Sequence, residues 1–564
     1  MHVRQRSWST AEAAKDVEAK DVKWFGQGHD VPKTGWKAVV KHQGNTFFLL
    51  LFAWVVLIYY IRRAPVAERE FASVAPKLAA ATLGNTTAPP ANLHLLVPAS
   101  KGDPNLCKVL VSAGILGYPS PVIINWNQTF NENLVEGGSH LAKISGIHDH
   151  LNKFEARQDD DLVLMVDGYD IWFQLRPQTL IDRYFAINRR ADERTNERLK
   201  EAASRHNIRQ EIVFGCQKRC WPWSENDPPC YAVPQSDLPS DVYGPQTDTD
   251  IGNEENPYIK FRPRFLNSGV AIGTVRAMRK LFAQALKNME NEKNFGSDQF
   301  IFSHIFGDQE VWREAIRQDS LSGPKKVAEK VIDRNQKVKW NPDHIEEVRK
   351  KAAQTTDGTY EFGIGVDFRS EIGLNTVFAE DDTAWLTWSN HDEVLEAKQA
   401  LEISAEDPRL QNLSTDIATT IPPFWTFNHE PSLPRWTNWS SIPLFTNIWH
   451  DNVPAVIHHN AHRDGRKALR MEWWDKIWFF RYMRTMYDAS IYEPIVPIAY
   501  SGYDEESQRV WWPGERWKGG GRNGPKIDSE IFDEQWVGFE EMCYEFHEEV
   551  FRDGKGPWTL PEAH

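Results

Sequence analysis

Short apolar runs and longer helical patterns alternate along the middle of the chain. The apolar runs have the length of strands at 93–98, 122–126 and 161–167, and the third is apolar between its two ends, as is typical of a strand covered on both faces. A helix is expected from Asp103-Pro104, where a capping residue precedes proline, and another over 139–156. This alternation predicts an α/β fold: a Rossmann-type, mostly parallel sheet flanked by helices, with ligands at the carboxyl ends of its strands.

Further apolar runs extend the predicted sheet. Strands are expected at 211–216 and 264–273, and the second run leads into a helix that should reach about residue 289. Residues 310–358 are charged and helical in character, so they are expected to form an insertion. The predicted order is a tail at 1–45, a membrane span at 46–61, a stem at 62–91, an α/β domain at 92–475 and a Trp- and Tyr-rich C-terminal extension at 476–564.

The apolar run near the amino terminus predicts a membrane anchor. Residues 46–61 carry no charge and are followed by Arg62 and Arg63. The run is shorter than the roughly 20 residues of a typical span, but the thinner membranes of the early secretory pathway tolerate shorter segments. A buried core helix is the alternative. The polar flanks of the run, and the Trp and Tyr side chains near its end, favour a span that precedes the α/β domain.

Glycosylation sequons predict the orientation of this anchor. Four Asn-x-Ser/Thr sequences follow the span and none precedes it, which favours a short cytoplasmic tail and a luminal remainder. We therefore expect a single-pass type II protein of the Golgi or endoplasmic reticulum membrane. The sequons begin at Asn85, Asn127, Asn412 and Asn438.

The composition narrows the possible partners. The formal net charge is -14, which argues against nucleic acid, because phosphate backbones need a basic surface. The 24 tryptophans suit either stacking on sugars or ordinary core packing. Among the five cysteines, the group at 216, 220 and 230 predicts one disulfide in an oxidising lumen, with a zinc site as the alternative. The odd number leaves at least one thiol free or paired with another molecule.

Two carboxylates mark the end of the third predicted strand. Asp167 ends the run and Asp170 follows three positions later. Such carboxylates can hold Mn²⁺ or Mg²⁺, and the cation can bridge the protein to a diphosphate and neutralise a leaving nucleotide. An acidic pair in an ordinary turn is the alternative. Asp159, Asp160 and Asp161 precede the strand and are expected to form a solvated turn.

Five short segments occur in the order expected of a known family. They read DDDLVLMVDGYDIWF at 159–173, VFGCQKRCWPW at 213–223, RFLNSGVAIGT at 264–274, SDQF at 297–300 and VIHHN at 456–460. Together they resemble the glycosyltransferase domain of the procollagen lysyl hydroxylase/glycosyltransferase enzymes, and less closely other two-aspartate transferases that use nucleotide sugars. The resemblance covers about residues 93 to 475, as islands, and implies a GT-A-like fold with a UDP-sugar as donor.

The resemblance also implies a metal site and a nucleotide site. Asp167, Asp170 and His458 match the family's metal ligands, and imidazole suits Mn²⁺. His459 is the alternative ligand. A solvent-facing helix lysine is the alternative reading of Lys143. The residues expected to contact the nucleotide are Val97, Lys143, Tyr169, Asn460 and Lys467.

The sugar and acceptor are expected beside the nucleotide. Trp221 and Asn267 would line the sugar cavity, and Asp298 with Gln299 would contact the acceptor or the transferred sugar. The family's aspartate cluster is reduced here to the single Asp298, so the acceptor is the least transferable inference.

Two other departures concern the segment after the metal histidine. The family's glycine is replaced there by His459, and Arg463 and Arg466 compete with Lys467 for the role of a basic residue near the diphosphate. The family's oxygenase domain has no counterpart, because the triplet His-Arg-Asp at 462–464 has no double-stranded β-helix pattern around it. We therefore expect no iron chemistry.

These observations predict a metal-dependent transferase that moves a hexose from a UDP-sugar to a protein or glycan hydroxyl. Asp298 is a candidate for positioning or deprotonating the acceptor, and Trp221 for stacking on the sugar. A luminal lectin or scaffold that kept the fold without turnover is one alternative. A metal-dependent phosphohydrolase that uses the same carboxylates is another.

Overall fold

The computed structural model describes residues 88–130, 138–292, 295–321, 340–427, 430–461, 469–492, 494–515, 524–528 and 534–558. The predicted tail, the membrane span at 46–61 and the stem up to residue 87 lie outside this part of the chain. Within it, no helix combines the length and the apolar character needed to cross a bilayer.

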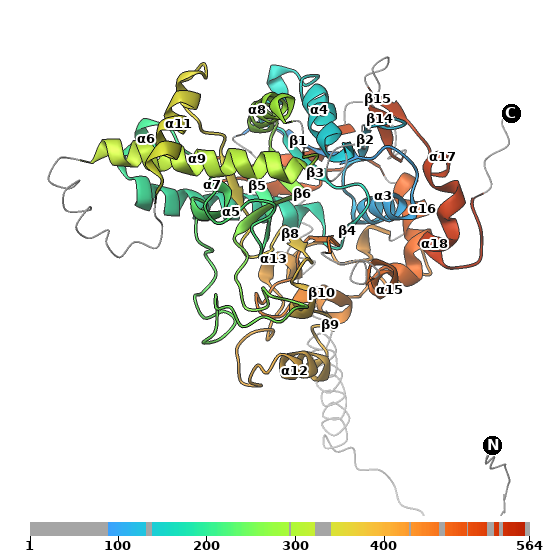
Figure 1. Cartoon of the computed structure of the whole chain (residues 1–564). Helices are drawn as coiled ribbons and strands as arrows, with labels where there is room; N and C mark the ends of the chain where they lie inside the picture. The colour runs from blue at the N-terminus through green and yellow to red at the C-terminus, as the bar shows by residue number, and fades with distance from the viewer. Residues whose placement is uncertain are drawn as a thin grey trace, which may run out of the picture. The chain divides into compact units, whose positions relative to one another are not determined.

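The described strands form one large sheet and one two-stranded sheet (Figure 1). The order in the large sheet is β15-β14-β2-β1-β3-β6-β5-β8-β11-β4, with β13 beside β1, β12 beside β13 and β7 beside β5; β9 and β10 form the small sheet. The strands are β1 Ala91–Pro98, β2 Val122–Ile124, β3 Leu162–Val166, β4 Ile171–Phe173, β5 Ile212–Gln217, β6 Phe265–Thr274, β7 Ile364–Val366, β8 Gly373–Asn375, β9 Thr383–Thr387, β10 Pro443–Asn447, β11 Val456–His458, β12 Ala499–Ser501, β13 Arg509–Pro513, β14 Lys526–Asp528 and β15 Glu534–Trp536.

The large sheet is mostly parallel, as predicted. β1 runs parallel to β2, β3 and β13, and β5 runs parallel to β7 and β8. The strand β6 is reversed and pairs antiparallel with both β3 and β5. Because β6 runs antiparallel to β3, the amino-terminal half of β6 lies at the same edge of the sheet as the carboxyl end of β3.

Helices cover both faces of the sheet. Side chains alternate along each strand, so the two faces carry two separate cores. Leu95 and Val97 of β1 belong to the core under α3, whereas Leu96 belongs to the core under α4, α8 and α9. Figure 1 shows α4 and α8 together, and α3 beside α16, α17 and α18. The helices are α3 Pro104–Leu116, α4 Ser139–Leu151, α5 Pro177–Leu199, α6 Glu201–Arg205, α7 Pro228–Tyr231, α8 Val275–Asn291, α9 Asp298–Ser320, α11 Pro342–Ala353, α12 His391–Ala400, α13 Thr415–Ala418, α15 Leu469–Trp473, α16 Met483–Tyr492, α17 Phe539–Cys543 and α18 His547–Phe551.

Local signals set several of these boundaries. Asp103 caps α3 by accepting a hydrogen bond from the backbone N–H of Asn105, and Gly117 ends the helix in the left-handed conformation. Thr274 caps α8 by accepting one from the N–H of Ala277. The predicted helix starts at these two positions are confirmed.

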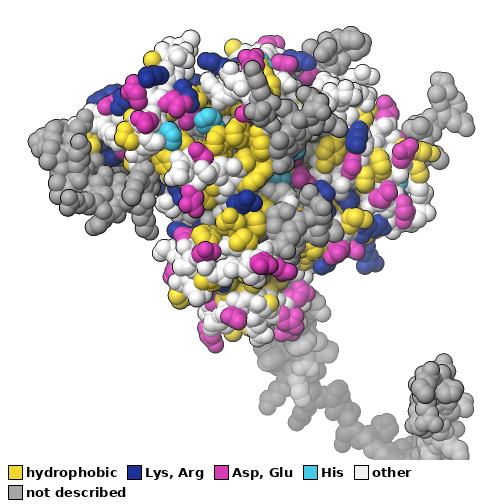
Figure 2. Space-filling model, viewed as in Figure 1, with side chains coloured by type: hydrophobic (Ala, Val, Ile, Leu, Met, Phe, Trp, Pro, Cys, Tyr) yellow, Lys and Arg dark blue, Asp and Glu magenta, His cyan; other side chains and the backbone are white. Residues whose placement is uncertain are grey.

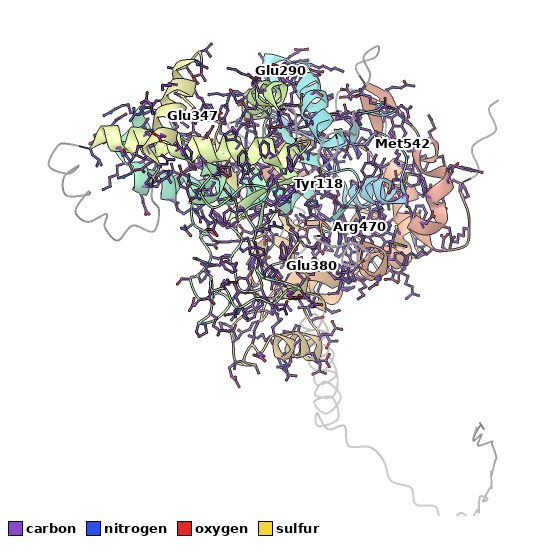
Figure 3. All side chains as sticks on the ribbon, viewed as in Figure 1. Tyr118, Glu290, Glu347, Glu380, Arg470 and Met542 are labelled. Carbon is purple, nitrogen blue, oxygen red and sulfur yellow. A yellow bond between two sulfur atoms is a disulfide. The ribbon has the colours of Figure 1, made fainter. Side chains whose placement is uncertain are left out.

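The C-terminal segment is built into the sheet. β13 pairs with β1 and β14 pairs with β2, each in parallel. A disulfide joins Cys107 of α3 to Cys543 of α17, next to Met542, which Figure 3 labels. The segment that reads as an extension therefore completes the central sheet and one of its two cores.

The remaining cysteines agree with the prediction for the group at 216, 220 and 230. Cys220 and Cys230 form a disulfide, and Cys216 is a buried free thiol. Burial raises the pKa of this thiol well above its usual range, so it is a core residue and not a reactive nucleophile. The zinc alternative has no support, because two of the three sulfurs are already joined.

The predicted insertion at 310–358 begins inside a core helix. α9 starts at Asp298 and is buried over most of its length. Its charged residues are paired: buried Glu310 contacts Arg198 at 2.6 Å and Arg313 at 2.7 Å. Charge along this stretch gave a surface-like pattern, but the ion pairs let the helix pack against the sheet.

Asp161 does not lie in a solvated turn, so that part of the prediction is wrong. Its carboxylate accepts hydrogen bonds from the backbone N–H and side-chain amide of Asn92, at 2.8 and 2.9 Å, and lies 3.0 Å from His94 Nε2. The residue is buried. It joins the amino ends of β1 and β3, whereas the neighbouring Asp160 is exposed as expected.

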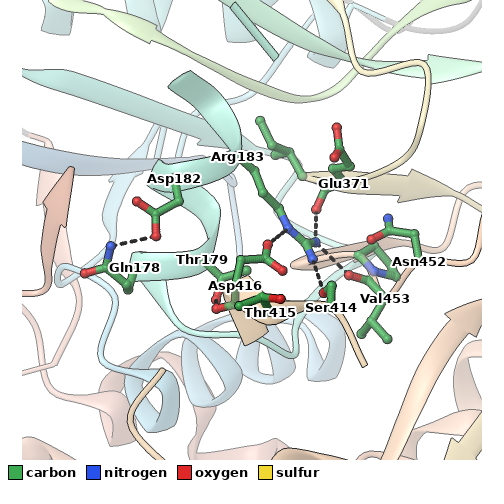
Figure 4. A network of polar contacts seen from close by, with 12 residues as sticks. Gln178, Thr179, Asp182, Arg183, Glu371, Ser414, Thr415, Asp416, Asn452 and Val453 are labelled. Atoms are coloured by element: carbon green, nitrogen blue, oxygen red, sulfur yellow. Dashed lines mark hydrogen bonds and ion pairs between the residues drawn. The ribbon is translucent and has the colours of Figure 1, made fainter. Parts of the chain in front are cut away.

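Buried Arg183 connects segments at the amino ends of two strands of the sheet (Figure 4). Arg183 of α5 donates hydrogen bonds to the carbonyl oxygens of Glu371 and Val453, at 2.6 and 2.7 Å, and forms an ion pair with Asp416. Glu371 and Val453 precede β8 and β11. α5 therefore holds the segments that lead into β8 and β11, and β11 carries the candidate His458 at its carboxyl end.

Candidate functional site

Three predicted metal ligands meet at the carboxyl edge of the sheet. Asp167 follows β3, and Asp170 precedes β4, whose Ile171 pairs with His458 of the antiparallel strand β11. His458 Nε2 lies 3.7 Å from Asp167 Oδ2 and 3.4 Å from Asp170 Oδ2. One ligand atom from each residue lies within 4.8 Å of the other two, which is the spacing of a site that can hold one cation.

His459, the alternative ligand, points away from this cluster. Side chains alternate along a strand, so its ring lies on the other face, against Trp172 at 3.8 Å between ring centroids. Burial lowers the pKa of His459 well below its ordinary value. His458 is therefore the histidine that the fold brings to Asp167 and Asp170.

The electrostatics of the cluster suit a cation. Burial alone would raise the pKa of Asp170, but His458 and Arg470 lower it to about 2. Asp170 Oδ1 is buried, and no described residue forms a hydrogen bond with it. An ionised carboxylate with a free buried oxygen fits a Mn²⁺ or Mg²⁺ ion, which takes oxygen and imidazole ligands.

Lys143 joins the metal cluster to Asp298. Its ammonium group lies 2.6 Å from Asp167 Oδ1, 2.8 Å from Asp298 Oδ2 and 2.9 Å from the carbonyl oxygen of Ser268. Burial would lower the pKa of Lys143, but the two carboxylates raise it above its ordinary value. Lys143 is buried, so the alternative of a solvent-facing helix lysine is wrong.

A chain of side-chain amides supports Trp221. Asn267 donates hydrogen bonds to Gln217 Oε1 at 2.9 Å and to Gln299 Oε1 at 3.0 Å, and Gln299 donates to the carbonyl oxygen of Trp221 at 3.0 Å. The Asn267 oxygen accepts from the N–H of Gly269 at 3.0 Å. The amide hydrogens of Asn267 are thus already used within the protein, which makes it a support for the cavity wall.

A cavity of about 420 Å³ opens over these groups. It contains most of the predicted site, together with residues that the sequence did not single out. The predicted residues in its wall are Asp167, Asp170, Trp221, Asn267, Asp298, Gln299, His458 and Asn460; the others are His140, Gln217, Arg219, Ser268, Gly269, Ser297, Val377, Phe378 and Ala461.

Two predicted nucleotide contacts, Val97 and Tyr169, are not among the residues of this cavity wall. Val97 is buried within β1. The Tyr169 hydroxyl accepts hydrogen bonds from the backbone N–H groups of Ser100 and Lys101, at 3.0 and 3.2 Å, and donates to the Lys101 carbonyl oxygen. Lys467, with its rivals at 463 and 466, lies outside the described residues.

The structure adds Arg470 to the site. This residue of α15, labelled in Figure 3, donates a hydrogen bond to the carbonyl oxygen of Tyr169 at 2.9 Å, between the two aspartates in sequence. Arg470 lies a few positions after the basic residues that the sequence considered, so the same signal could have included it. Gln217 ends β5, and the rule that ligands bind at strand ends could have found it.

Aromatic side chains cluster around Trp221 of the cavity wall. Trp223 stacks on Phe300 at 4.2 Å between ring centroids, and Trp221 and Phe300 both contact Phe295. All four rings are half-buried. Phe300 lies near the amino-terminal end of α9, and Figure 2 shows hydrophobic side chains gathered over this end of the helix. Such rings can stack on sugars or pack against an apolar partner.

Comparison with known proteins agrees with the resemblance seen in the sequence. No protein-family model matches the chain. Over 198 residues it is 24% identical to the multifunctional procollagen lysine hydroxylase and glycosyltransferase of Caenorhabditis elegans, a match that covers 35% of this chain and 20% of that protein. The chain therefore spans about a fifth of the curated relative that it matches. This distant similarity supports a relationship with the procollagen lysyl hydroxylase/glycosyltransferase family.

Proposed function

We propose that this chain is a metal-dependent glycosyltransferase that transfers a hexose from a UDP-sugar to a hydroxyl of a protein or glycan. The observation that carries the proposal is the cluster of Asp167, Asp170 and His458 at the carboxyl edge of the sheet. It lies beside a cavity of about 420 Å³, a volume within the usual range of small-molecule sites. The similarity to a relative named as a glycosyltransferase supports the same reaction class. The luminal side of the Golgi or endoplasmic reticulum membrane, with residues 46–61 as anchor, is part of this proposal.

The three ligands would hold Mn²⁺ or Mg²⁺. When bound, such a cation supplies positive charge against the diphosphate of the departing nucleotide. Asp170 would coordinate through its unpartnered oxygen, and His458 through Nε2. Arg470 adds a fixed positive charge next to the same edge, where a diphosphate would be neutralised.

Asp298 is better suited to positioning than to proton removal. Burial would raise its pKa, but Lys143 and His140 lower it, and a carboxylate with a lowered pKa is a weak base near neutral pH. Its buried ion pair with Lys143 fixes its direction toward the cavity. We assign Asp298 to orienting the acceptor hydroxyl or a sugar hydroxyl, and Trp221 to stacking on the transferred sugar.

UDP release by the purified full chain tests the proposal. The assay uses a panel of UDP-sugars, with Mn²⁺ and with a chelator, and compares the wild-type chain with Asp170→Ala. Asp160→Ala is the matched control, because it removes an exposed carboxylate before the same strand and leaves the site intact. We expect release from one donor that needs Mn²⁺, is lost in Asp170→Ala and persists in Asp160→Ala.

Other outcomes separate the alternatives. Binding of a UDP-sugar or glycan without any release would favour a lectin or scaffold. Release of inorganic phosphate instead of UDP would favour a phosphohydrolase. Release that is equal in wild-type chain and Asp170→Ala would contradict the proposed metal site.

A further inference from the structure

Asn375 touches the metal-site histidine directly. It ends β8, and in the parallel pairing with β11 it lies opposite His458. Its Oδ1 is 2.6 Å from His458 Nδ1. Both side chains are buried. The contact therefore joins two neighbouring strands immediately behind the Asp167 and Asp170 carboxylates.

The second contact of Asn375 fixes which way its amide faces. Nδ2 donates to the carbonyl oxygen of Cys216 at 2.9 Å. A backbone carbonyl only accepts hydrogen bonds, so the amide nitrogen must face Cys216 and the amide oxygen must face His458. Since that oxygen is an acceptor, the hydrogen between the two side chains belongs to His458 Nδ1.

This arrangement selects one tautomer of the neutral imidazole. With its hydrogen on Nδ1, the ring presents the lone pair of Nε2, and Nε2 is the atom that faces Asp167 and Asp170. A metal-bound histidine that donates its other N–H to a buried acceptor is held in orientation and made a better ligand.

The fold leaves room for Asn375 at this point. A Cβ added to Gly215 would lie 2.9 Å from Asn375 Nδ2, which is too close for an ordinary contact. Gly215 follows an irregularity in the pairing of β5 with β6, and its neighbour Cys216 supplies the carbonyl that binds the amide. Three strands therefore cooperate to place one amide group.

We propose that Asn375 is a positioning residue that fixes the tautomer and direction of His458 for binding a divalent cation. The inference rests on the proposed function only in taking the cluster as a cation site. It applies to cation affinity whether or not the chain transfers a sugar.

Direct binding of Mn²⁺ to the full chain tests this role. The concentration of free Mn²⁺ is measured from its electron paramagnetic resonance signal. Asn375→Leu removes the acceptor and should weaken Mn²⁺ binding by about 10- to 100-fold. Asn375→Asp keeps an oxygen that can accept from Nδ1, although its second oxygen meets the Cys216 carbonyl oxygen, so this variant should bind Mn²⁺ more tightly than Asn375→Leu does. Asn375→Ser is a second variant for the case that Asn375→Leu does not fold. Its hydroxyl is too short to reach both partners, so it should also weaken Mn²⁺ binding.

Asn452 offers a matched control. It is also buried and donates its amide to the carbonyl oxygens of Ser370 and Arg369, at 2.7 and 3.3 Å, at the opposite end of the same strands. Asn452→Leu and Asn452→Ser should lower stability without changing Mn²⁺ affinity.

The outcomes divide clearly. Weak binding in Asn375→Leu or Asn375→Ser, with tighter binding in Asn375→Asp, supports the role even if no UDP-sugar is ever cleaved. Wild-type affinity in a folded Asn375→Leu or Asn375→Ser overturns it. Loss of affinity that is equal in the Asn452 variants, or a wild-type chain that binds no Mn²⁺, overturns it as well.

Discussion

Substitution of Gly269 by alanine should weaken cation binding at the candidate metal site, because the added methyl group would displace the His458 ring. Gly269 belongs to β6 and lies directly against the His458 ring. An added Cβ would be 2.1 Å from His458 Cε1, 2.5 Å from Nδ1 and 2.7 Å from Nε2. The backbone of Gly269 also holds the site, because its carbonyl oxygen accepts from the N–H of Asp167 at 2.9 Å.

The size of the effect follows from this geometry. Ordinary contact begins at 3.4 Å, so the ring must move by more than about 1 Å, and a misplacement of that size can cost roughly 100-fold in rate. The same movement would break the hydrogen bond to Asn375. Overpacking of this kind also costs about 1–3 kcal/mol of stability, which a protein of this size can tolerate.

Mn²⁺ affinity, UDP release and the free energy of unfolding would be measured together for Gly269→Ala. Gly373→Ala is the control, because a Cβ there would meet Val270 at 3.4 Å, an ordinary contact in the same sheet. We expect a large loss of Mn²⁺ affinity in the first variant and little change in the second. Normal Mn²⁺ affinity in a folded Gly269→Ala chain would refute the reasoning.

Three further predictions concern stability. Loss of the Cys107–Cys543 disulfide, which spans 436 residues, should lower the free energy of unfolding by about 2–5 kcal/mol, as measured by denaturation of the double serine variant. Asp161→Ala should cost about 1–3 kcal/mol in the same measurement, because it leaves buried donors of Asn92 unsatisfied. Burial, and then Glu371, raises the pKa of Asp367 to about 6, so the folded chain keeps a proton that the unfolded chain releases near pH 4. Stability should therefore fall as the pH rises from about 4 to about 6, and Asp367→Asn should remove that slope.

The sequence predicted the parts of the fold that depend on neighbours along the chain. The apolar run before Asp167 and the cap at Asp103 are local signals, and both describe the structure well. The pair Asp167 and Asp170 was recognisable because a strand end delivers its carboxylates to a shared edge. His458 needed the resemblance, since nothing local distinguishes it from His459 except alternation along a three-residue strand.

The features that the sequence did not predict depend on distant partners. β12, β13 and β14 have three to five residues each, too few for a clear periodicity, and β13 and β14 find their partners some 400 residues away in β1 and β2. Buried Asp161 and Glu310 look like surface residues until Asn92 and Arg313 are placed beside them. A polar residue is buried when its partner is present, and the partner is set by the tertiary fold.

The site combines two kinds of support with different consequences. The cation side stands on strand ends, and His458 is held by Asn375, Gly269 and the pairing of β11 with β4, all within the sheet. The proposed sugar side lies on the loop after β5, which carries Trp221 and is closed by the Cys220–Cys230 disulfide. Loops vary more readily than sheets without loss of the fold. We therefore expect the chemistry of the cation to be fixed by the sheet, and the choice of sugar and acceptor to be set by this loop and the aromatic rings beside it.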